Sequence, residues 1–273
     1  GQAGNVQNRG IELTLGYDQT FGDFNYNTTC TATSNKNKIK KLASDVKNPV
    51  SGELMDLSDI KLGRFRLREG GEVGALYADR RVEKNDEGYI PYTPGQTIAT
   101  ENTTPFKIGT VNPKWNLGWR HGFNYKGINA SVMFTARIGG NVISKTQATL
   151  DRFGVSKASA DARETGYVML GNIKMKPQDY YGTIYDLDSY YVYSATNIRL
   201  QEASIGYTLP NKWFGNVVKN VNISVYGTNL WMIYNKAPYD PELTASTGTF
   251  GQGYDYFMLP SSRTYGFSLK FGF

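Results

Sequence analysis

Apolar and polar residues alternate along most of the chain, and this two-residue period predicts β-strands rather than helices. The alternation is clearest in Gly10–Asp18, Asp23–Ser34, Pro113–Tyr125, Gly127–Gly139, Thr196–Leu209, Lys219–Trp231 and Ser261–Phe273. Two weaker stretches, Leu62–Glu69 and Val73–Lys84, bring the expected total to about nine strands. The phase of Thr196–Leu209 slips near Gln201 and Glu202, where a β-bulge is the simplest explanation.

Short and long connections alternate between these strands. The short ones are Gln19–Gly22, Gly70–Glu72, Lys126–Gly127 and Pro210–Val218, and the long ones are Asn35–Lys61, Asn85–Asn112, Gly140–Ala195 and Ile233–Pro260. An all-β, antiparallel, up-and-down transmembrane β-barrel has this arrangement, with all its long loops outside the cell. A soluble carbohydrate-binding β-sandwich, whose strands also alternate, is the competing interpretation.

Aromatic residues gather near both ends of the expected strands. Near the long loops stand Trp115, Trp231 and Tyr234, and near the short turns stand Tyr17, Phe24, Tyr125, Tyr207, Trp213, Phe271 and Phe273. Two such belts are expected where a barrel meets the two membrane interfaces. The polar residues between the apolar ones, mainly Asn, Thr, Ser and Gly, would then face a water-filled lumen.

Composition narrows the function classes. The chain of 273 residues has a single cysteine, Cys30, which excludes a disulfide framework within it, and a single histidine, His121, which argues against a His-based metal site or catalytic triad. Its net charge is +6, but the only dense basic run is Lys36–Lys41, which is short and predicts a solvated loop rather than a nucleic-acid partner. No enzyme site emerges from the sequence.

Several segments, taken in order, resemble the SusC-like branch of TonB-dependent outer-membrane transporters. They are "GNVQNRGIELTLGYDQTFGDFNYNTTCTATSNKNKIKKL", "REGGEVGALYADR", "NPKWNLGWRHGFNYKGINASVMFTARIGGNVI", "NIRLQEASIGYTLPNKW", "YGTNLWMIYNKAPYDPE" and "SSRTYGFSLKFGF". The resemblance covers nearly the whole chain. It implies the last nine or so strands of a barrel of about 22 strands in the outer membrane of a Gram-negative cell, with the plug domain and the TonB-contacting segment absent from this chain.

The same resemblance implies a function and a set of partners. Members of this family import oligosaccharides or peptides, work with a SusD-like surface lipoprotein as a lid, and draw energy through TonB. The implied partners are the remainder of the barrel and its plug, the lipoprotein, TonB, membrane lipid and the cargo. No cofactor is implied.

Candidate functional residues fall into a lumen set and an outer-loop set. Arg120, Arg137 and Glu202 would face the lumen, where they could contact the plug or the cargo. In the outer loops, Tyr185, Tyr190 and Tyr191 could stack on sugar rings, but loop packing or contact with the lipoprotein is the favoured interpretation, and Asp240 and Asp255 are further candidate contact residues. Asp240, Glu242 and Asp255 share one long loop and could hold Ca²⁺, or the loop could be folded by turn residues alone.

The final strand carries a candidate barrel-assembly signal. Thr264, Gly266, Leu269 and Phe271 fit the pattern polar–x–Gly–x–x–apolar–x–apolar, and Phe273 closes the chain. Such an edge strand can pair with an assembly machine by β-augmentation, and Gly266 would let the two backbones approach closely.

Overall fold

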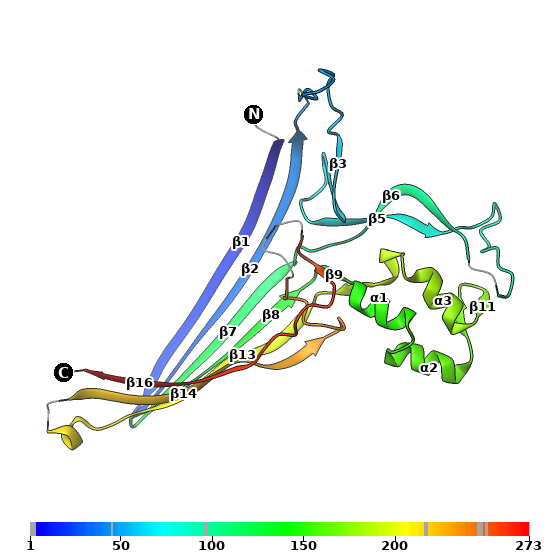
Figure 1. Ribbon diagram of the computed structural model, residues 1–273. Helices are drawn as coiled ribbons and strands as arrows, with labels where there is room; N and C mark the ends of the chain where they lie inside the picture. The colour runs from blue at the N-terminus through cyan, green and yellow to red at the C-terminus, as the bar shows by residue number, and fades with distance from the viewer. Residues whose placement is uncertain are drawn as a thin grey trace.

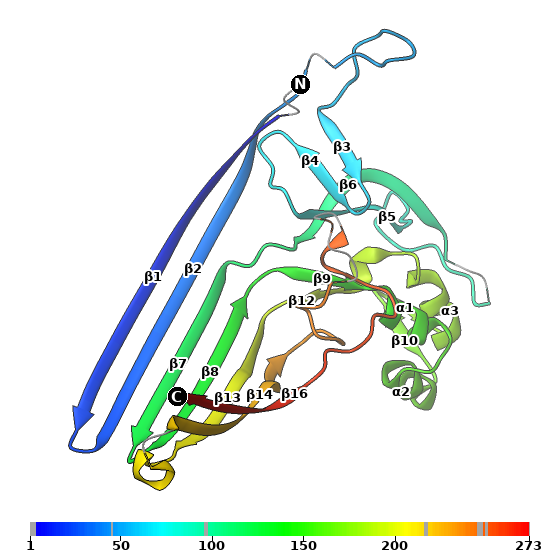
Figure 2. The same cartoon turned by 60° about the vertical axis from the view of Figure 1, so that its left-hand side comes forward.

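A single antiparallel sheet of seven strands dominates the structure, and we call it the wall sheet (Figure 1). The computed structural model describes residues 4–44, 46–95, 98–215, 218–244, 248 and 251–272. The wall strands are β1 (Gly4–Phe21), β2 (Phe24–Leu42), β7 (Trp115–Tyr125), β8 (Ile128–Ile138), β13 (Asn197–Thr208), β14 (Lys219–Asn235) and β16 (Thr264–Gly272). They lie side by side in chain order (Figure 2), so the predicted up-and-down antiparallel fold is confirmed, although the sheet does not close on itself in this chain.

Short turns join the wall strands at one end, and long connections join them at the other (Figures 1 and 2). The long connections are residues 43–114, 139–196 and 236–263, and together we call them the long-connection region. The predicted alternation of short and long connections therefore holds for the wall sheet.

The expected number of strands was wrong, because two of the predicted strands do not belong to the wall. Leu62–Glu69 and Val73–Lys84 fall mainly in a separate four-stranded sheet inside the first long connection, and the tight turn Gly70–Glu72 lies there too. The predicted loops Asn35–Lys61 and Asn85–Asn112 are also partly strand, because β2 runs to Leu42 and β6 fills much of the second loop.

The long-connection region is built from short elements. Its sheets contain β3 (Asp59–Leu62), β4 (Phe65–Arg68), β5 (Ala75–Val82) and β6 (Thr100–Thr110); β9 (Asn141–Ser144), β12 (Val192–Ser194) and β15 (Tyr254–Asp255); and β10 (Val168–Leu170) with β11 (Ile173–Met175). Its helices are α1 (Lys145–Arg152), α2 (Lys157–Thr165) and α3 (Pro177–Ile184), with a single helical turn at η1 (Asp188–Tyr190). Another single turn, η2 (Asn211–Phe214), lies outside this region, in the short connection before β14.

The segment Gly140–Ala195 is folded, although the sequence pattern indicated only a very long loop. Each of its first two helices has a side-chain cap: the Ser144 hydroxyl accepts a hydrogen bond from the Gln147 backbone at 3.0 Å, and Ser156 with Ser159 forms a capping box. Gly166 ends α2 in the left-handed conformation. None of the helices in the described residues is long and apolar enough to cross a membrane.

The two faces of the wall sheet differ sharply. One face carries rows of apolar side chains that stay exposed, with Leu15 at 74% and Phe267 at 65%. The row nearest the short turns is Phe21, Phe24, Tyr125, Ile128, Tyr207, Ile223 and Leu269. No second sheet in the described part of the chain covers this face, so the alternative of a soluble β-sandwich is wrong.

The height of the apolar face suits a bilayer. On this face of β1 the exposed apolar residues run from Ile11 to Phe21, which is ten residue steps. At about 3.3 Å per residue this gives roughly 33 Å along the strand. A strand tilt of about 40° reduces the height to about 25 Å, the thickness of the apolar band of outer-membrane barrels.

A predicted irregularity in the sheet is confirmed. The register of β13 against both of its neighbours shifts between Leu200 and Glu202, which leaves Gln201 as the extra residue of a bulge. On β14 the matching place is Asn229–Leu230, and Asn229 has a positive φ of 53°. The two strands therefore bend together at this level.

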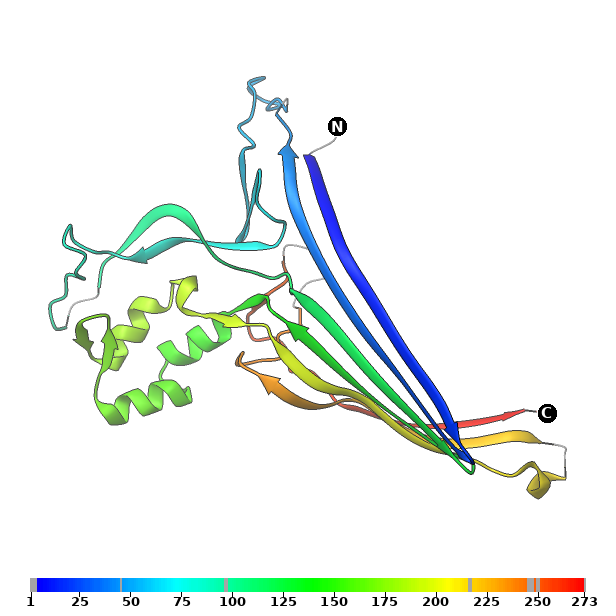
Figure 3. The same cartoon turned by 180° about the vertical axis from the view of Figure 1, so that it is seen from behind.

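The long-connection region has small cores of its own, whereas the wall sheet has a bare face. Figure 3 shows the helices and short strands of this region gathered at one end of the wall sheet. One core contains Phe65, Leu76, Val111 and Ile143, and it is joined by Val192 and Tyr254. These residues come from all three long connections, which therefore pack into one body at one end of the wall.

Candidate functional site

The polar face of the wall sheet is built from cross-strand rows of small amide, hydroxyl and glycine residues. One row is Asp18, Asn27, Gly122, Ser131, Ser204, Tyr226 and Gly266, and the next is Thr20, Asn25, Asn124, Asn129, Gly206, Ser224 and Ser268. Neighbours within and between rows are hydrogen-bonded: the Ser131 and Ser204 hydroxyls are 2.8 Å apart, and the Asn25 amide donates to Asp18 Oδ1 at 2.8 Å. This face offers both donors and acceptors to whatever lies against it.

Two of the predicted lumen residues lie together on this face. Arg120 and Glu202 share a cross-strand row through Met133, and Arg120 Nη2 lies 3.6 Å from Glu202 Oε1. Their side chains are 49% and 35% exposed, so water or a ligand can reach both. Glu202 is in phase with Ser204 and Gly206 on this face, and the bulge at Gln201 shifts the phase of the residues before it.

The third predicted lumen residue, Arg137, lies elsewhere. Its guanidinium donates Nη2–H to the backbone carbonyl of Val111, which belongs to the first long connection. Its Nε is buried and has no hydrogen-bond partner within the described residues. Arg137 therefore joins the wall sheet to the long-connection region, and the structure does not bring it together with Arg120 and Glu202.

A buried ion cluster lies where β13, β14 and the last long connection meet, and it was not found from the sequence. The guanidinium of Arg199 donates to both carboxylate oxygens of Asp240, at 2.7 and 2.9 Å, and it forms an ion pair with Glu242 at 2.7 Å. It also donates to Oδ1 of Asn197 at 3.0 Å and of Asn229 at 3.2 Å. The Arg199 and Asp240 side chains are only 5% and 8% exposed.

Local sequence explains why the last long connection reaches Arg199. The Asn235 amide, at the end of β14, donates to the carbonyls of Ala237 and Tyr239, and this folds the chain back over the sheet. Burial by itself would raise the pKa of Asp240, but hydrogen bonds from Arg199 and from the Glu242 backbone lower it on balance below the usual 3.8. The signal available in the sequence was an arginine on the polar side of a strand together with the two carboxylates of "YDPE".

The predicted outer-loop tyrosines have different environments. Tyr190 is 40% exposed, whereas Tyr191 is only 3% exposed and packs in a core with Ala148, Tyr181 and Ile184. The ring of Tyr185 is stacked by two cations, with Lys145 Nζ at 3.5 Å and Arg152 Cζ at 4.3 Å from its centroid. Of the three, Tyr190 offers the most surface to a partner.

The acidic residues considered for Ca²⁺ do not converge. Asp240 and Glu242 face Arg199, whereas Asp255 is 3% exposed and accepts a 2.6 Å hydrogen bond from the Ser144 hydroxyl. Among the residues that the structure describes, no group of three or more His, Cys, Asp or Glu side chains could hold a metal ion. A calcium site in this loop stays a prediction that the geometry does not support.

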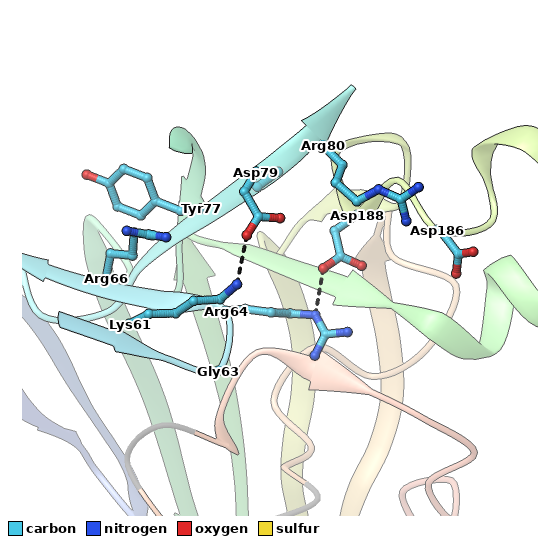
Figure 4. A pocket seen from close by; sticks show the side chains of 10 residues that line it. Lys61, Gly63, Arg64, Arg66, Tyr77, Asp79, Arg80, Asp186 and Asp188 are labelled. Carbon is cyan, nitrogen blue, oxygen red and sulfur yellow. Dashed lines mark hydrogen bonds and ion pairs between the residues drawn. The ribbon is translucent and has the colours of Figure 1, made fainter. Parts of the chain in front are cut away.

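A small pocket of about 70 Å³ in the long-connection region is lined by charged side chains (Figure 4). Lys61 pairs with Asp79 at 2.7 Å, and this hydrogen bond lowers the pKa of Asp79. Arg64 pairs with Asp188 at 2.8 Å, and its guanidinium carbon lies 3.7 Å from the centroid of the Tyr254 ring. Arg64, Asp188 and Tyr254 belong to the three different long connections, so Arg64 helps to join them.

The final strand β16 pairs with β14 and ends the wall sheet. A Cβ on Gly266 would lie 2.2 Å from the Tyr226 ring, so this glycine makes room for an aromatic side chain on the polar face. Leu269 and Phe271 are each 51% exposed and share the apolar face. Phe273 lies outside the described residues, and the assembly signal stays a prediction.

Two curated proteins are similar to this chain over nearly its whole length. One is the TonB-dependent receptor P3 of Formosa agariphila, 26% identical over 98% of this chain, and the other is the TonB-dependent receptor P26 of the same organism, 23% identical over 96%. This chain spans only 29% and 28% of their lengths. No family model matches the chain.

Solved structures confirm the fold. The RagAB peptide importer in its "closed-closed" state matches 96% of this chain and 29% of that one, with a TM-score of 0.65 and 17% identity. Its "open-open" state gives a TM-score of 0.63 and 19% identity. The resemblance to TonB-dependent outer-membrane transporters and the outer-membrane location expected from the sequence are thereby confirmed. These relatives are named as receptors and importers, not as enzymes.

Proposed function

We propose that this chain forms part of the wall and the outer connections of an active importer in the outer membrane, energised through TonB. The observation that carries this proposal is the two-faced wall sheet, whose bare apolar face suits lipid and whose other face is polar. A plug and the rest of the barrel complete the transporter, and a SusD-like surface lipoprotein covers it.

The cargo is an oligosaccharide or a peptide. The rows of Asn, Thr and Ser on the polar face suit hydroxyl groups or peptide groups, both of which donate and accept hydrogen bonds. The Arg120–Glu202 pair adds one positive and one negative group that either cargo could meet. The RagAB structures are of a peptide importer, and this favours a peptide in the choice between the two.

Uptake by cells that carry the full-length transporter tests this proposal. We expect accumulation of labelled oligopeptides or oligosaccharides that depends on both the transporter and TonB, and the preferred cargo should emerge from parallel assays. Equal uptake by cells without TonB would contradict active import.

The lipoprotein partner is expected to bind the exposed side of the long-connection region. Helix α2 is well suited for a test, because its capping box and Gly166 mark its two ends. Deletion of Ser156–Thr165 should weaken co-purification of a SusD-like lipoprotein with the full-length transporter while leaving its heat-modifiable migration unchanged. Undiminished co-purification would remove this helix from the interface.

A further inference from the structure

The basic run Lys36–Lys41 is strand, not loop, and this changes what it can do. It forms the upper part of β2, paired with β1 from Arg9–Lys36 up to Asn5–Lys41. The ends of β1 and β2 rise beyond those of β7 and β8 on the side of the long connections (Figures 1 and 2). Successive side chains of this run therefore point to opposite faces of the two-stranded ribbon that the upper ends of β1 and β2 form.

One face of this ribbon is occupied by the protein itself. Asn37 exchanges side-chain hydrogen bonds with the backbone of Val73, at 3.1 and 2.6 Å, and Ile39 is only 1% exposed. The backbone of Ile39 also pairs with Gly70 and Gly71 at 2.8 Å each. This face continues the polar face of the wall sheet.

The opposite face carries exposed cations. The residues of the strip are Arg9, Lys36, Lys38, Lys40 and Lys114, and together they line an open groove of about 870 Å³ that also includes Ile11 and Trp115. We call these five residues the cationic strip. Within the described residues, no carboxylate lies within ion-pair distance of any of them.

The cationic strip lies directly above the apolar band and on the same face. Ile11 pairs with Ser34 and Trp115 pairs with Ile138 at the upper end of this band, and the next pair along β1 and β2 on that face is Arg9 with Lys36. With Ile11 at the edge of the hydrocarbon and Trp115 at the interface, the strip reaches the level of the lipid headgroups. Unpaired cations at that level attract anionic lipid.

We propose that the cationic strip binds the phosphate of an anionic lipid headgroup in the outer leaflet, with the lipid's acyl chains lying against the apolar rows below. Charge complementarity favours this occupant, since no carboxylate among the described residues pairs with any of the five cations. The continuity of the strip with the apolar band favours a lipid over a free anion, because only a lipid uses both surfaces. The inference goes beyond import, and it depends only on the position of the sheet in the membrane.

Lipid binding to the purified full-length transporter tests the proposal by native mass spectrometry. Phosphatidylglycerol and phosphatidylcholine with identical acyl chains serve as probes. We expect the transporter to bind phosphatidylglycerol roughly tenfold more tightly at low ionic strength, and this preference should shrink in about 1 M salt. Inorganic phosphate at millimolar concentration should not compete.

Charge-neutral variants locate the site. The triple variant Arg9→Gln, Lys36→Gln, Lys38→Gln should lose the preference, whereas Lys36→Arg with Lys38→Arg should keep it. The matched control is Lys84→Gln, Lys157→Gln, Lys176→Gln, which removes three exposed cations from the long-connection region. Heat-modifiable migration checks that each barrel is folded. An unchanged preference in the triple variant, an equal loss in the control, or no preference in the parent protein would overturn the proposal.

Discussion

The wall sheet and the long-connection region are stabilised in different ways. The wall sheet is a regular ladder with one polar face and one bare apolar face, and backbone pairing between neighbouring strands holds it together. The long-connection region depends on small buried cores, capped helices and ion pairs such as Arg64–Asp188. The first architecture repeats a simple period, and the second is specified residue by residue.

The wall sheet and the long-connection region meet at Arg199. Among the proposed substitutions, replacing this residue should have the largest effect on stability. Replacement Arg199→Leu leaves the buried carboxylate of Asp240 without its cationic partner. Removal of one member of a buried pair costs about 3–5 kcal/mol. The free energy of unfolding of the full-length protein should fall by that order, as measured from its denaturant midpoint in detergent.

A proteolysis assay separates the two regions in the same variant. If Arg199 fastens the last long connection to the wall, residues 236–263 should be cleaved faster in Arg199→Leu, while the wall strands stay protected. Lys157→Leu is the control, because the Lys157–Asp161 pair is exposed and such pairs contribute about 0.3–0.5 kcal/mol. Equal stability of the two variants would show that the cluster does not join the regions.

The same cluster predicts a dependence on pH. The folded-state pKa of Asp240 lies below the unfolded value of 3.8, so its contribution is complete above 3.8 and is lost as the pH falls through the folded value. The difference in denaturant midpoint between the parent protein and Asp240→Asn should stay constant near neutral pH and shrink below about pH 4. A difference that grows on acidification would contradict this assignment.

Glycine on the polar face provides a test within the wall sheet alone. A Cβ on Gly266 would collide with the Tyr226 ring at 2.2 Å, whereas a Cβ on Gly272 of the same strand would lie 3.6 Å from the Lys219 carbonyl. Gly266→Ala should therefore lower the free energy of unfolding by roughly 1–2 kcal/mol, and Gly272→Ala should change it little. Adding Tyr226→Ala should remove most of the Gly266→Ala effect in a double-mutant cycle. An undiminished effect would mean that Tyr226 is not the obstacle.

The wall sheet could be predicted from the sequence because apolar and polar residues alternate along each of its strands. The alternation in Pro113–Tyr125 and the slip near Gln201 both have their counterparts in the structure. The strands Leu62–Glu69 and Val73–Lys84 alternate as well, and periodicity alone could not show that they form a separate sheet. Which strands pair is decided by contacts distant in sequence, such as Asn37 with Val73.

The candidate site was predicted only in part, for a similar reason. Arg120 and Glu202 were found because each stands on the polar side of a strong strand. Arg199 was missed, since its importance comes from Asp240, which lies 41 positions away and is delivered by an irregular turn. Tyr191 and Asp255 were named as candidate contact residues of the outer loops, but both are buried in a region whose sequence has no repeating pattern.

The Arg120–Glu202 pair gives the smallest expected effect on stability, and it therefore separates structure from function most cleanly. Its atoms are 3.6 Å apart and its side chains are substantially exposed, so water and salt screen the attraction. Glu202→Gln or Arg120→Gln should change the free energy of unfolding by at most about 1 kcal/mol.

If these side chains contact cargo or plug, each variant should nevertheless alter uptake. The exchanged variant Arg120→Glu, Glu202→Arg keeps a pair of opposite charges but reverses their positions. Uptake restored by the exchange would mean that only the pair matters, whereas uptake still impaired would mean that each charge faces a fixed partner across the polar face.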